Sequence, residues 1–151
     1  MANPKVAFIG GSGLYHLDGL ADKTEVSVKT PFGRPSDDII TGTIDSVPVA
    51  FLPRHGRGHR YSPTEIPVRA NIYALKTLGV DRIVSISAVG SLREEIKPLD
   101  MVVPNQIIDH TTSRSSSFFG GGIVAHVGFA DPFCPNLRTI VVEAALKHND
   151  G

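Results

Sequence analysis

The stretch KVAFIGGSG, residues 5–13, joins an apolar run to a turn made almost entirely of glycine. Val6–Ile9 has the composition of a buried strand, and Gly10–Gly13 ends that strand abruptly. Backbone N–H groups in such a turn can point inward and bind an anion, and Ser12 adds a hydroxyl. A glycine turn after a first strand is, however, often purely structural. The pattern is not a dinucleotide fingerprint, because His16 stands where a third glycine is needed, and it is not a P-loop, because no Gly-Lys-Ser/Thr follows.

Further along the chain, strand-like and helix-like patterns alternate. Apolar or β-branched runs bounded by turn residues predict strands at Thr24–Lys29, Asp38–Ile44, Val47–Leu52, Asp81–Ser87 and Met101–Val103. The spacing of apolar residues predicts helices at Ile66–Leu78 and Pro135–His148. Strands separated by helices should lie parallel, so the sequence predicts an α/β protein.

Each predicted helix has one apolar face that we expect to be buried. In the first helix this face comprises Val68, Ile72, Leu75 and Gly79. Gly79 is also well placed to end that helix in a left-handed conformation. In the second helix the face comprises Leu137, Ile140, Val141, Ala144 and Ala145.

The composition limits the kind of protein. The chain has 151 residues, 41% of them hydrophobic, which suits one domain and argues against general disorder. Its 15 basic residues balance 15 acidic ones, whereas a nucleic-acid-binding protein usually needs a basic excess, so we expect no nucleic-acid partner. A single cysteine, Cys134, excludes an intramolecular disulfide and a cysteine-cluster zinc site.

We expect no targeting or membrane-spanning segment. The start of the chain lacks a basic region followed by a long apolar one, and the longest low-charge stretch, Phe118–Ala130, is too short to span a bilayer. The sequence therefore predicts a soluble protein of the cytoplasm, with the nucleus as a second location and no membrane partner.

Three loops that follow predicted strands carry residues suited to binding an anion. They are Gly10–Gly13, the pair Arg54 and His55 within RHGRGH, and Ser87–Ser91. Ligands of open α/β sheets bind beyond the carboxyl ends of the strands, so these loops should converge. An arginine, a histidine, two hydroxyls and several backbone N–H groups would together form a phosphate site.

The remaining histidines and the cysteine have simpler explanations. His55 and His59 are four residues apart, but intervening glycines disfavour a helix and neighbouring arginines repel a cation, so we expect no metal site. His126 lies among apolar residues and should be half-buried, and Cys134 should be a buried apolar side chain. The other histidines are expected at the surface: His16, His110 and His148.

Several motifs together resemble the trimeric nucleoside phosphorylases. They are GGSGL at 10–14, FGRPSD at 32–37, LPRHGRGH at 52–59, SAVGSLREEIKPLD at 87–100, SFFGGG at 117–122 and HVGFADPFCP at 126–135. The last three are most similar to the methylthioadenosine branch of that family. The resemblance runs in order from Lys5 to about His148, and it implies the N-terminal part of a three-layer α/β fold with a mixed central sheet flanked by helices.

The resemblance implies an enzyme that cleaves the N-glycosidic bond of a purine nucleoside with inorganic phosphate as co-substrate and no further cofactor. In the methylthioadenosine branch the products are adenine and 5-methylthioribose 1-phosphate, in purine and methionine salvage. The phosphate-binding residues that it implies are Ser12, Arg54, His55, Ser87 and the backbone of Ala88. It also implies that His59 faces the ribose or the phosphate and that His126 reaches the neighbour's 5′-substituent pocket across the interface of a homotrimer.

The length of the chain bears on this expectation. In the family, the residues that bind and protonate the purine come from a C-terminal half, so residues 1–151 are expected to be a nucleoside phosphorylase domain truncated there, and no catalytic residue is assigned. Three alternatives stay open. The first is a catalytically incompetent, truncated module that binds phosphate or nucleoside or that oligomerises. The second is a purine nucleoside phosphorylase with another purine preference, and the third is a general mononucleotide-binding domain.

Overall fold

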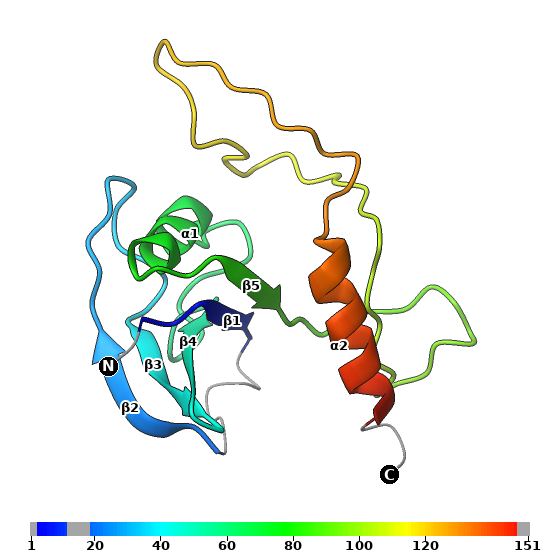
Figure 1. Cartoon of the computed structure of the whole chain (residues 1–151). Helices are drawn as coiled ribbons and strands as arrows, with labels where there is room; N and C mark the ends of the chain where they lie inside the picture. Colours follow the sequence, from blue (N-terminus) through cyan, green and yellow to red (C-terminus); the bar gives the residue numbers. More distant parts are fainter. Residues whose placement is uncertain (1–2, 12–18, 148–151) are drawn as a thin grey trace. The chain divides into compact units, whose positions relative to one another are not determined.

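A computed structural model describes residues 3–11 and 19–147 of the chain. The chain divides into two units (Figure 1). The first unit consists of Met1–Val89 and Ser113–Phe118, and the second of Gly90–Thr112 and Phe119–Gly151. The predicted site residues that follow strands belong to the first unit, whereas His126 belongs to the second.

The described residues of the first unit form a mixed sheet of five strands. These are β1 (Val6–Gly10), β2 (Ala21–Val26), β3 (Ile39–Ile44), β4 (Val47–Pro53) and β5 (Arg82–Ser85). The order across the sheet is β2-β3-β4-β1-β5; β1 is parallel to β4 and β5, whereas β3 is antiparallel to β2 and β4. The strands predicted in this part of the chain and the mixed sheet are confirmed, with strand ends displaced by a few residues.

The three parallel strands end at one edge of the sheet. β1 lies between its two partners, with Gly10 opposite Pro53 of β4 and Ile9 opposite Ser85 of β5. The connection from β4 to β5 passes through the helix α1 (Val68–Thr77). The segments that leave β4 and β5 therefore start beside the end of β1, which is where the anion-binding loops were predicted to meet.

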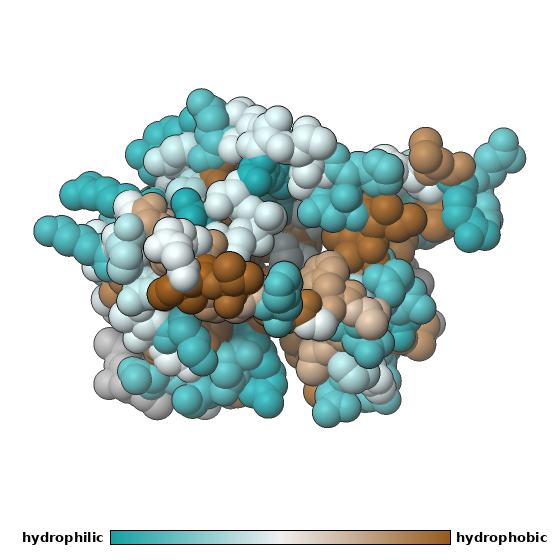
Figure 2. Space-filling view, turned by 90° about the horizontal axis from the view of Figure 1, so that it is seen from above, coloured by the Kyte–Doolittle hydropathy of each residue, from teal (hydrophilic) through white to brown (hydrophobic). Residues whose placement is uncertain are grey.

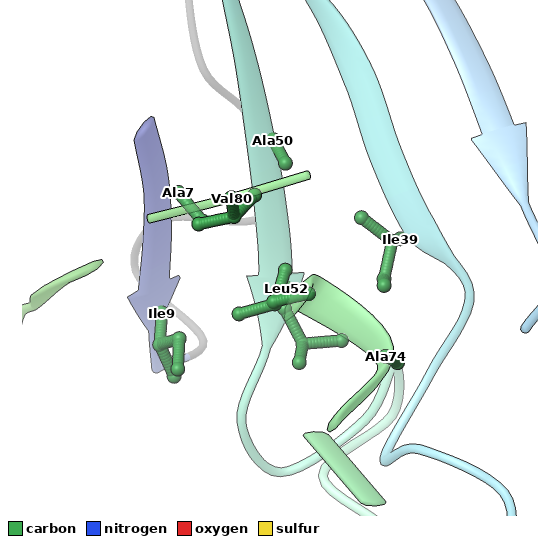
Figure 3. Packing of buried hydrophobic residues seen from close by; sticks show 8 residues of the cluster. Ala7, Ile9, Ile39, Ala50, Leu52, Ala74 and Val80 are labelled. Atoms are coloured by element: carbon green, nitrogen blue, oxygen red, sulfur yellow. The ribbon is translucent and has the colours of Figure 1, made fainter. Parts of the chain in front are cut away.

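The core of the first unit lies between the sheet and α1 (Figure 3). Small side chains on both sides, among them Ala50 of β4 and Ala74 of α1, allow the helix to approach the strands closely. The full cluster consists of Ala7, Ile9, Ile39, Ala50, Leu52, Ala74, Leu75 and Val80. Because these residues come from β1, β3, β4, α1 and the segment before β5, the core fixes the strands that carry the site relative to one another.

The buried face of α1 differs from the predicted one. Leu75 is fully buried and Ile72 packs against the core, as predicted, but Val68 is 41% exposed. Asn71 is buried instead, because its side-chain Oδ1 accepts a hydrogen bond from the backbone N–H of Ser36 at 2.7 Å. This polar contact turns the buried face away from Val68, and apolar spacing alone cannot reveal it.

Gly79 ends α1 as predicted. Its φ of +91° lies in the left-handed region, where a side chain would be strained. The N–H of Gly79 donates to Lys76 O at 3.0 Å, and the N–H of Val80 donates to Leu75 O at 3.1 Å. These two bonds form a Schellman motif, which satisfies the last carbonyls of the helix and directs the chain into β5.

The second unit contains one helix among its described residues, α2 (Pro135–Lys147). The helix is confirmed, but the prediction that its apolar face is buried is wrong. Leu137 and Val141 are only half-buried, and Ile140 is 61% exposed. The reason is that the other described residues of this unit form no helix or strand that could cover the face.

The predicted strand Met101–Val103 is also absent from the described structure. Met101 and Val102 are 71% and 51% exposed, and no described strand pairs with them. Pro104 follows directly and lacks the N–H that a ladder needs. An apolar run predicts a strand only where a neighbouring strand can pair with it, and none of the described strands lies in the second unit.

Apolar patches interrupt the otherwise hydrophilic surface drawn in Figure 2. Large apolar side chains that are more than half exposed include Leu92, Ile108, Val124 and Leu146. Within the described ranges, neither helix is long and apolar enough to cross a membrane.

Candidate anion-binding site

The chain segments that follow β1, β4 and β5 lie side by side at the carboxyl edge of the sheet. Arg54, the first residue after β4, donates its backbone N–H to Gly10 O at 2.8 Å. Ile86, the first residue after β5, donates its backbone N–H to Ile9 O at 2.9 Å. These bonds extend both parallel ladders beyond the strands and confirm that the three loops begin together.

The side chain of Arg54 links the ends of all three strands. Its Nη1 donates to Ser87 Oγ at 2.5 Å and to Ile86 O at 3.2 Å. A Cβ atom placed on Gly11 would lie 3.4 Å from Arg54 Nη2, so the backbone of that glycine lies against the guanidinium. The structure thus brings an arginine, a serine hydroxyl and the start of the glycine turn to one place.

His55 is buried beside Arg54, with 8% of its surface exposed. Its ring Nδ1 lies 2.8 Å from Tyr61 O, and because a carbonyl only accepts, Nδ1 carries the proton. Nε2 is then the acceptor for the Nε–H of Arg54 at 3.3 Å. These two bonds assign the tautomer that carries its proton on Nδ1 and place Nε2 on the side of Arg54.

His59 stacks on His55, with 4.3 Å between ring centroids and 12° between ring planes. The loop between them consists of turns and not of a helix. Gly56 and Gly58 have φ values of +70° and +78°, which only glycine adopts readily and which explain the glycines of RHGRGH. In the described part of the chain, no group of three or more His, Cys, Asp or Glu side chains could hold a metal ion.

Two other residues predicted for the site lie near it in sequence. Ala88 is exposed and follows Ser87, three residues beyond the end of β5. Ser12, which follows Gly11, lies outside the described residues, as do His16 and His148. The phosphate contacts predicted for Ser12 and Ala88 stay predictions, as does the surface position predicted for His16 and His148.

In the described part of the second unit, both histidines and the cysteine are exposed. His110 is at the surface, as predicted. His126 and Cys134 are exposed too, so the predictions of a half-buried histidine and a buried cysteine are wrong. The apolar neighbours that suggested burial of His126, namely Val124, Val127 and Phe129, are themselves exposed, because the described residues 119–134 form no helix or strand.

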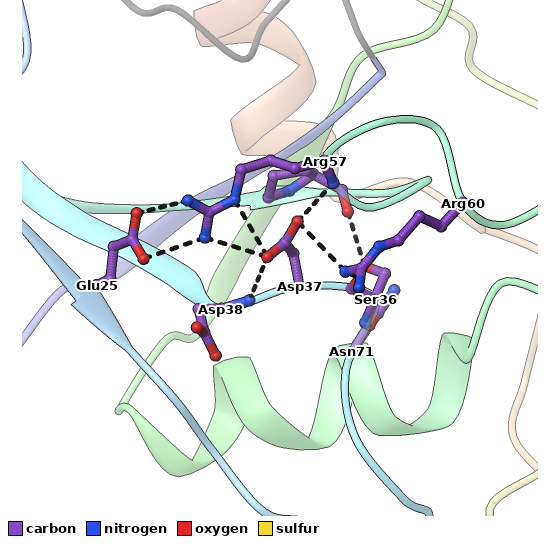
Figure 4. Close-up of polar contacts among 8 residues, drawn as sticks. Glu25, Ser36, Asp37, Asp38, Arg57, Arg60 and Asn71 are labelled. Atoms are coloured by element: carbon purple, nitrogen blue, oxygen red, sulfur yellow. Dashed lines mark hydrogen bonds and ion pairs between the residues drawn. The ribbon is translucent and has the colours of Figure 1, made fainter.

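A network of charged side chains, which was not predicted from the sequence, stabilises the RHGRGH loop (Figure 4). Asp37 Oδ2 accepts the backbone N–H of Arg57 at 2.5 Å, and Asp37 Oδ1 accepts from Arg57 Nη2 at 3.1 Å. The same guanidinium donates to both carboxylate oxygens of Glu25, at 2.6 and 3.1 Å. Asp37 belongs to the motif FGRPSD, but the three residues come from separate segments, so no local spacing connects them.

The network shifts the pKa values of its members. Burial alone would raise the pKa of Asp37, but hydrogen bonds from the backbone and guanidinium of Arg57 outweigh it and hold that pKa below its usual range. Hydrogen bonds from Arg57 also lower the pKa of Glu25. In turn, Glu25 and Asp37 raise the pKa of Arg57. All three groups are therefore charged at neutral pH.

A neutral contact fastens the start of the same loop. Ser36 is fully buried and donates its hydroxyl to Pro53 O, at the end of β4, at 2.7 Å. Its backbone N–H is bound by Asn71 of α1, and its carbonyl accepts from Arg60 Nη2 at 3.1 Å. Ser36 therefore connects Pro53 and Arg60, at the two ends of the loop, to Asn71 of α1.

The arrangement suits a small oxyanion. The guanidinium of Arg54 is a cation that presents several hydrogen-bond donors in a fixed plane. Ser87 adds a hydroxyl, and Gly11, which follows β1, lies against the same guanidinium at this strand edge. A tetrahedral phosphate has acceptor oxygens in every direction, so it can use donors that converge from three loops.

A family model described as the phosphorylase superfamily matches residues 5–150. The chain belongs to this superfamily, which confirms the resemblance seen in the sequence. Within it, the chain is similar to S-methyl-5′-thioadenosine phosphorylases. It is 60% identical over 145 residues to the one from Thermosynechococcus vestitus, covering 96% of this chain and 50% of that protein. It is 56% identical over 143 residues to the one from Geobacter sulfurreducens, covering 94% and 50%.

Solved structures of methylthioadenosine phosphorylases have the same fold over this chain. One, from an Antarctic soil metagenomic library, superimposes with a TM-score of 0.91 at 59% identity and covers 95% of this chain and 50% of that one. Another, from Schistosoma mansoni in complex with tubercidin, gives 0.88 at 42% identity, with 95% and 52% covered. The chain thus spans about half the length of the curated relatives it matches, and its mixed sheet corresponds to part of the nucleoside phosphorylase fold.

Proposed function

We propose that this chain forms the phosphate-binding part of a nucleoside phosphorylase that acts on 5′-methylthioadenosine. Inorganic phosphate is the co-substrate, and the products are adenine and 5-methylthioribose 1-phosphate. The observation that carries the proposal is the position of the Arg54 guanidinium, which joins Ser87 after β5 to the glycine turn after β1. The names of the relatives, all S-methyl-5′-thioadenosine phosphorylases at 54–60% identity among the first seven, support the choice of nucleoside.

The reaction follows from placing phosphate at this site. The bond between C1′ and the purine nitrogen breaks, its electron pair leaves with the purine, and a phosphate oxygen forms the new bond to C1′. Overall, the purine gains the proton that the hydrogen phosphate loses, so neutral adenine is released. The transition state has oxocarbenium character, so an anion held in line with C1′ stabilises its positive charge. Arg54 and Ser87 would hold and orient that anion, while His55, buried next to the guanidinium, limits where the phosphate can sit.

Three narrower proposals accompany this one. His59 stacks on His55 at the surface of the loop, a position compatible with a contact to ribose or phosphate. His126, exposed in the second unit, is proposed to reach a neighbouring subunit's 5′-substituent pocket in a homotrimer. The protein is proposed to act in the cytoplasm.

Release of adenine tests the proposed reaction. The chain at high concentration is incubated with 5′-methylthioadenosine, with and without phosphate, and adenine is followed by chromatography. Phosphate-dependent release supports the proposal, and guanosine or inosine as substrate separates it from another purine preference. If phosphate binds but no purine is released, the alternative of a non-catalytic binding module is favoured.

A further inference from the structure

The loop that carries Arg54 and His55 is not held by regular secondary structure. It consists of consecutive turns, and Gly56, Gly58 and His59 all have positive φ. A loop of this kind keeps one conformation only when contacts from outside select it. The groups that supply those contacts therefore decide where the guanidinium and the imidazole stand.

Asp37 supplies the central contacts. Its Oδ2 accepts a hydrogen bond from the backbone N–H of Arg57, and its Oδ1 accepts two from the side chain of that residue. Arg60 Nη2 lies 3.7 Å from Asp37 Oδ2. The Asp37 side chain is only 8% exposed. A carboxylate this well covered is unfavourable unless its charge is matched, and here the loop arginines match it (Figure 4).

Glu25 holds the outer side of the same arginine. Its two oxygens accept from Nη1 and Nη2 of Arg57 in a fork-like pair. The guanidinium of Arg57 is thereby committed to two carboxylates. Of the cations in RHGRGH, Arg57 fastens the loop, whereas Arg54 is turned toward Ser87.

We propose that Asp37 is a positioning residue for anion binding: by holding Arg57 and Arg60 it fixes the loop that presents Arg54 and His55 to the ligand. This inference rests on the proposed function, because the ligand is the phosphate proposed there. Asp37 acts through the loop and does not itself bind the anion.

The sign of one measurement separates positioning from simple electrostatics. Removing a carboxylate near an anion site should tighten anion binding if only charge matters. If Asp37 positions the loop, its removal should weaken binding instead. Asp38→Asn is the matched control, because it removes the same charge one residue further along the chain. The carboxylate of Asp38 points away from Arg57 in Figure 4.

Phosphate is titrated calorimetrically into the unaltered chain and into Asp37→Ala, Asp37→Asn and Asp38→Asn, at a temperature where each keeps the unaltered circular dichroism spectrum. We expect Asp37→Ala to raise the Kd for phosphate on the order of tenfold. Asp37→Asn keeps one acceptor oxygen and should recover part of the loss, while Asp38→Asn should stay within about twofold of the unaltered chain. Phosphate affinity that is equal or higher in Asp37→Ala overturns the proposal.

A second readout does not depend on phosphate. The ¹⁵N chemical shifts of the His55 ring report which nitrogen is protonated, and the bond to Tyr61 O requires Nδ1–H. In Asp37→Ala we expect this pattern to be lost or averaged, and in Asp37→Asn to be partly restored. An unchanged His55 pattern in Asp37→Ala contradicts the positioning role. If the unaltered chain shows the pattern but binds no phosphate, the proposed function fails and the positioning of the loop is still tested.

Discussion

Replacing Asn71 by alanine tests the buried connection between α1 and the site. The Oδ1 atom of Asn71 accepts the backbone N–H of Ser36 at 2.7 Å, and both residues are at most 3% exposed. In Asn71→Ala this N–H loses its partner in a place that water does not reach. Because Ser36 also binds Pro53 at the start of the loop, the effect should extend to the loop itself.

The size of the effect follows from two opposing contributions. A buried N–H without a partner costs about 1–3 kcal/mol. Alanine is a better helix former than asparagine and returns about 0.5 kcal/mol. The net loss in the free energy of unfolding should therefore be roughly 0.5–2.5 kcal/mol, which lowers Tm by about 1–10 °C for a chain of this length.

Urea unfolding followed by circular dichroism measures this loss. Lys76→Ala, on an exposed position of the same helix, is the matched control and should leave the midpoint nearly unchanged. If Asn71→Ala unfolds at the same urea concentration as Lys76→Ala, the hydrogen bond to Ser36 does not stabilise the fold and the account of the helix face is wrong.

Three further predictions concern stability, each measured by the urea midpoint. Burial would raise the pKa of Asp37 but hydrogen bonds from Arg57 lower it, so this carboxylate stabilises the fold above its unfolded pKa, near 4. That stability should be lost as pH falls through the lowered folded pKa of Asp37. Between about pH 5 and pH 3, Arg57→Met should therefore lose less stability than the unaltered chain, and equal losses contradict the pairing of Asp37 with Arg57. Gly79→Ala places a side chain at φ +91° and should cost about 1–2 kcal/mol, whereas an equal cost for Gly90→Ala would refute the strain argument. Leu75→Ala removes a fully buried side chain and should cost about 2–5 kcal/mol of unfolding free energy; a loss below 1 kcal/mol would mean that the core around Leu75 is not tightly packed.

The sheet could be predicted because its strands carry their own signals. Val6–Ile9 and Val47–Leu52 are apolar runs stopped by glycine or proline, and strand ends in an α/β sheet meet at one edge. From this the meeting of Arg54 with Ser87 followed without knowledge of any contact. The end of α1 could also be predicted, because Gly79 has a conformational preference that acts locally.

The features that could not be predicted share a physical cause: burial and pairing depend on segments that are distant in the sequence. The pair formed by Asp37 and Arg57 joins two loops, and nothing in the spacing of either loop indicates it. Asn71 is buried by a polar bond that an apolar pattern hides. Met101–Val103 and the face of α2 have the right composition, but the described residues around them provide no strand or core to pack against.

Calorimetric titration of phosphate into the Arg54→Ala chain tests the central claim most directly. Arg82→Ala is the matched control, because Arg82 is an exposed arginine paired with Asp81 at the start of β5. We predict that the unaltered chain and Arg82→Ala bind phosphate with similar affinity, and that Arg54→Ala binds at least about tenfold more weakly. Full phosphate affinity in Arg54→Ala would contradict the claim that this guanidinium, held between the ends of β1 and β5, is the anchor of the site.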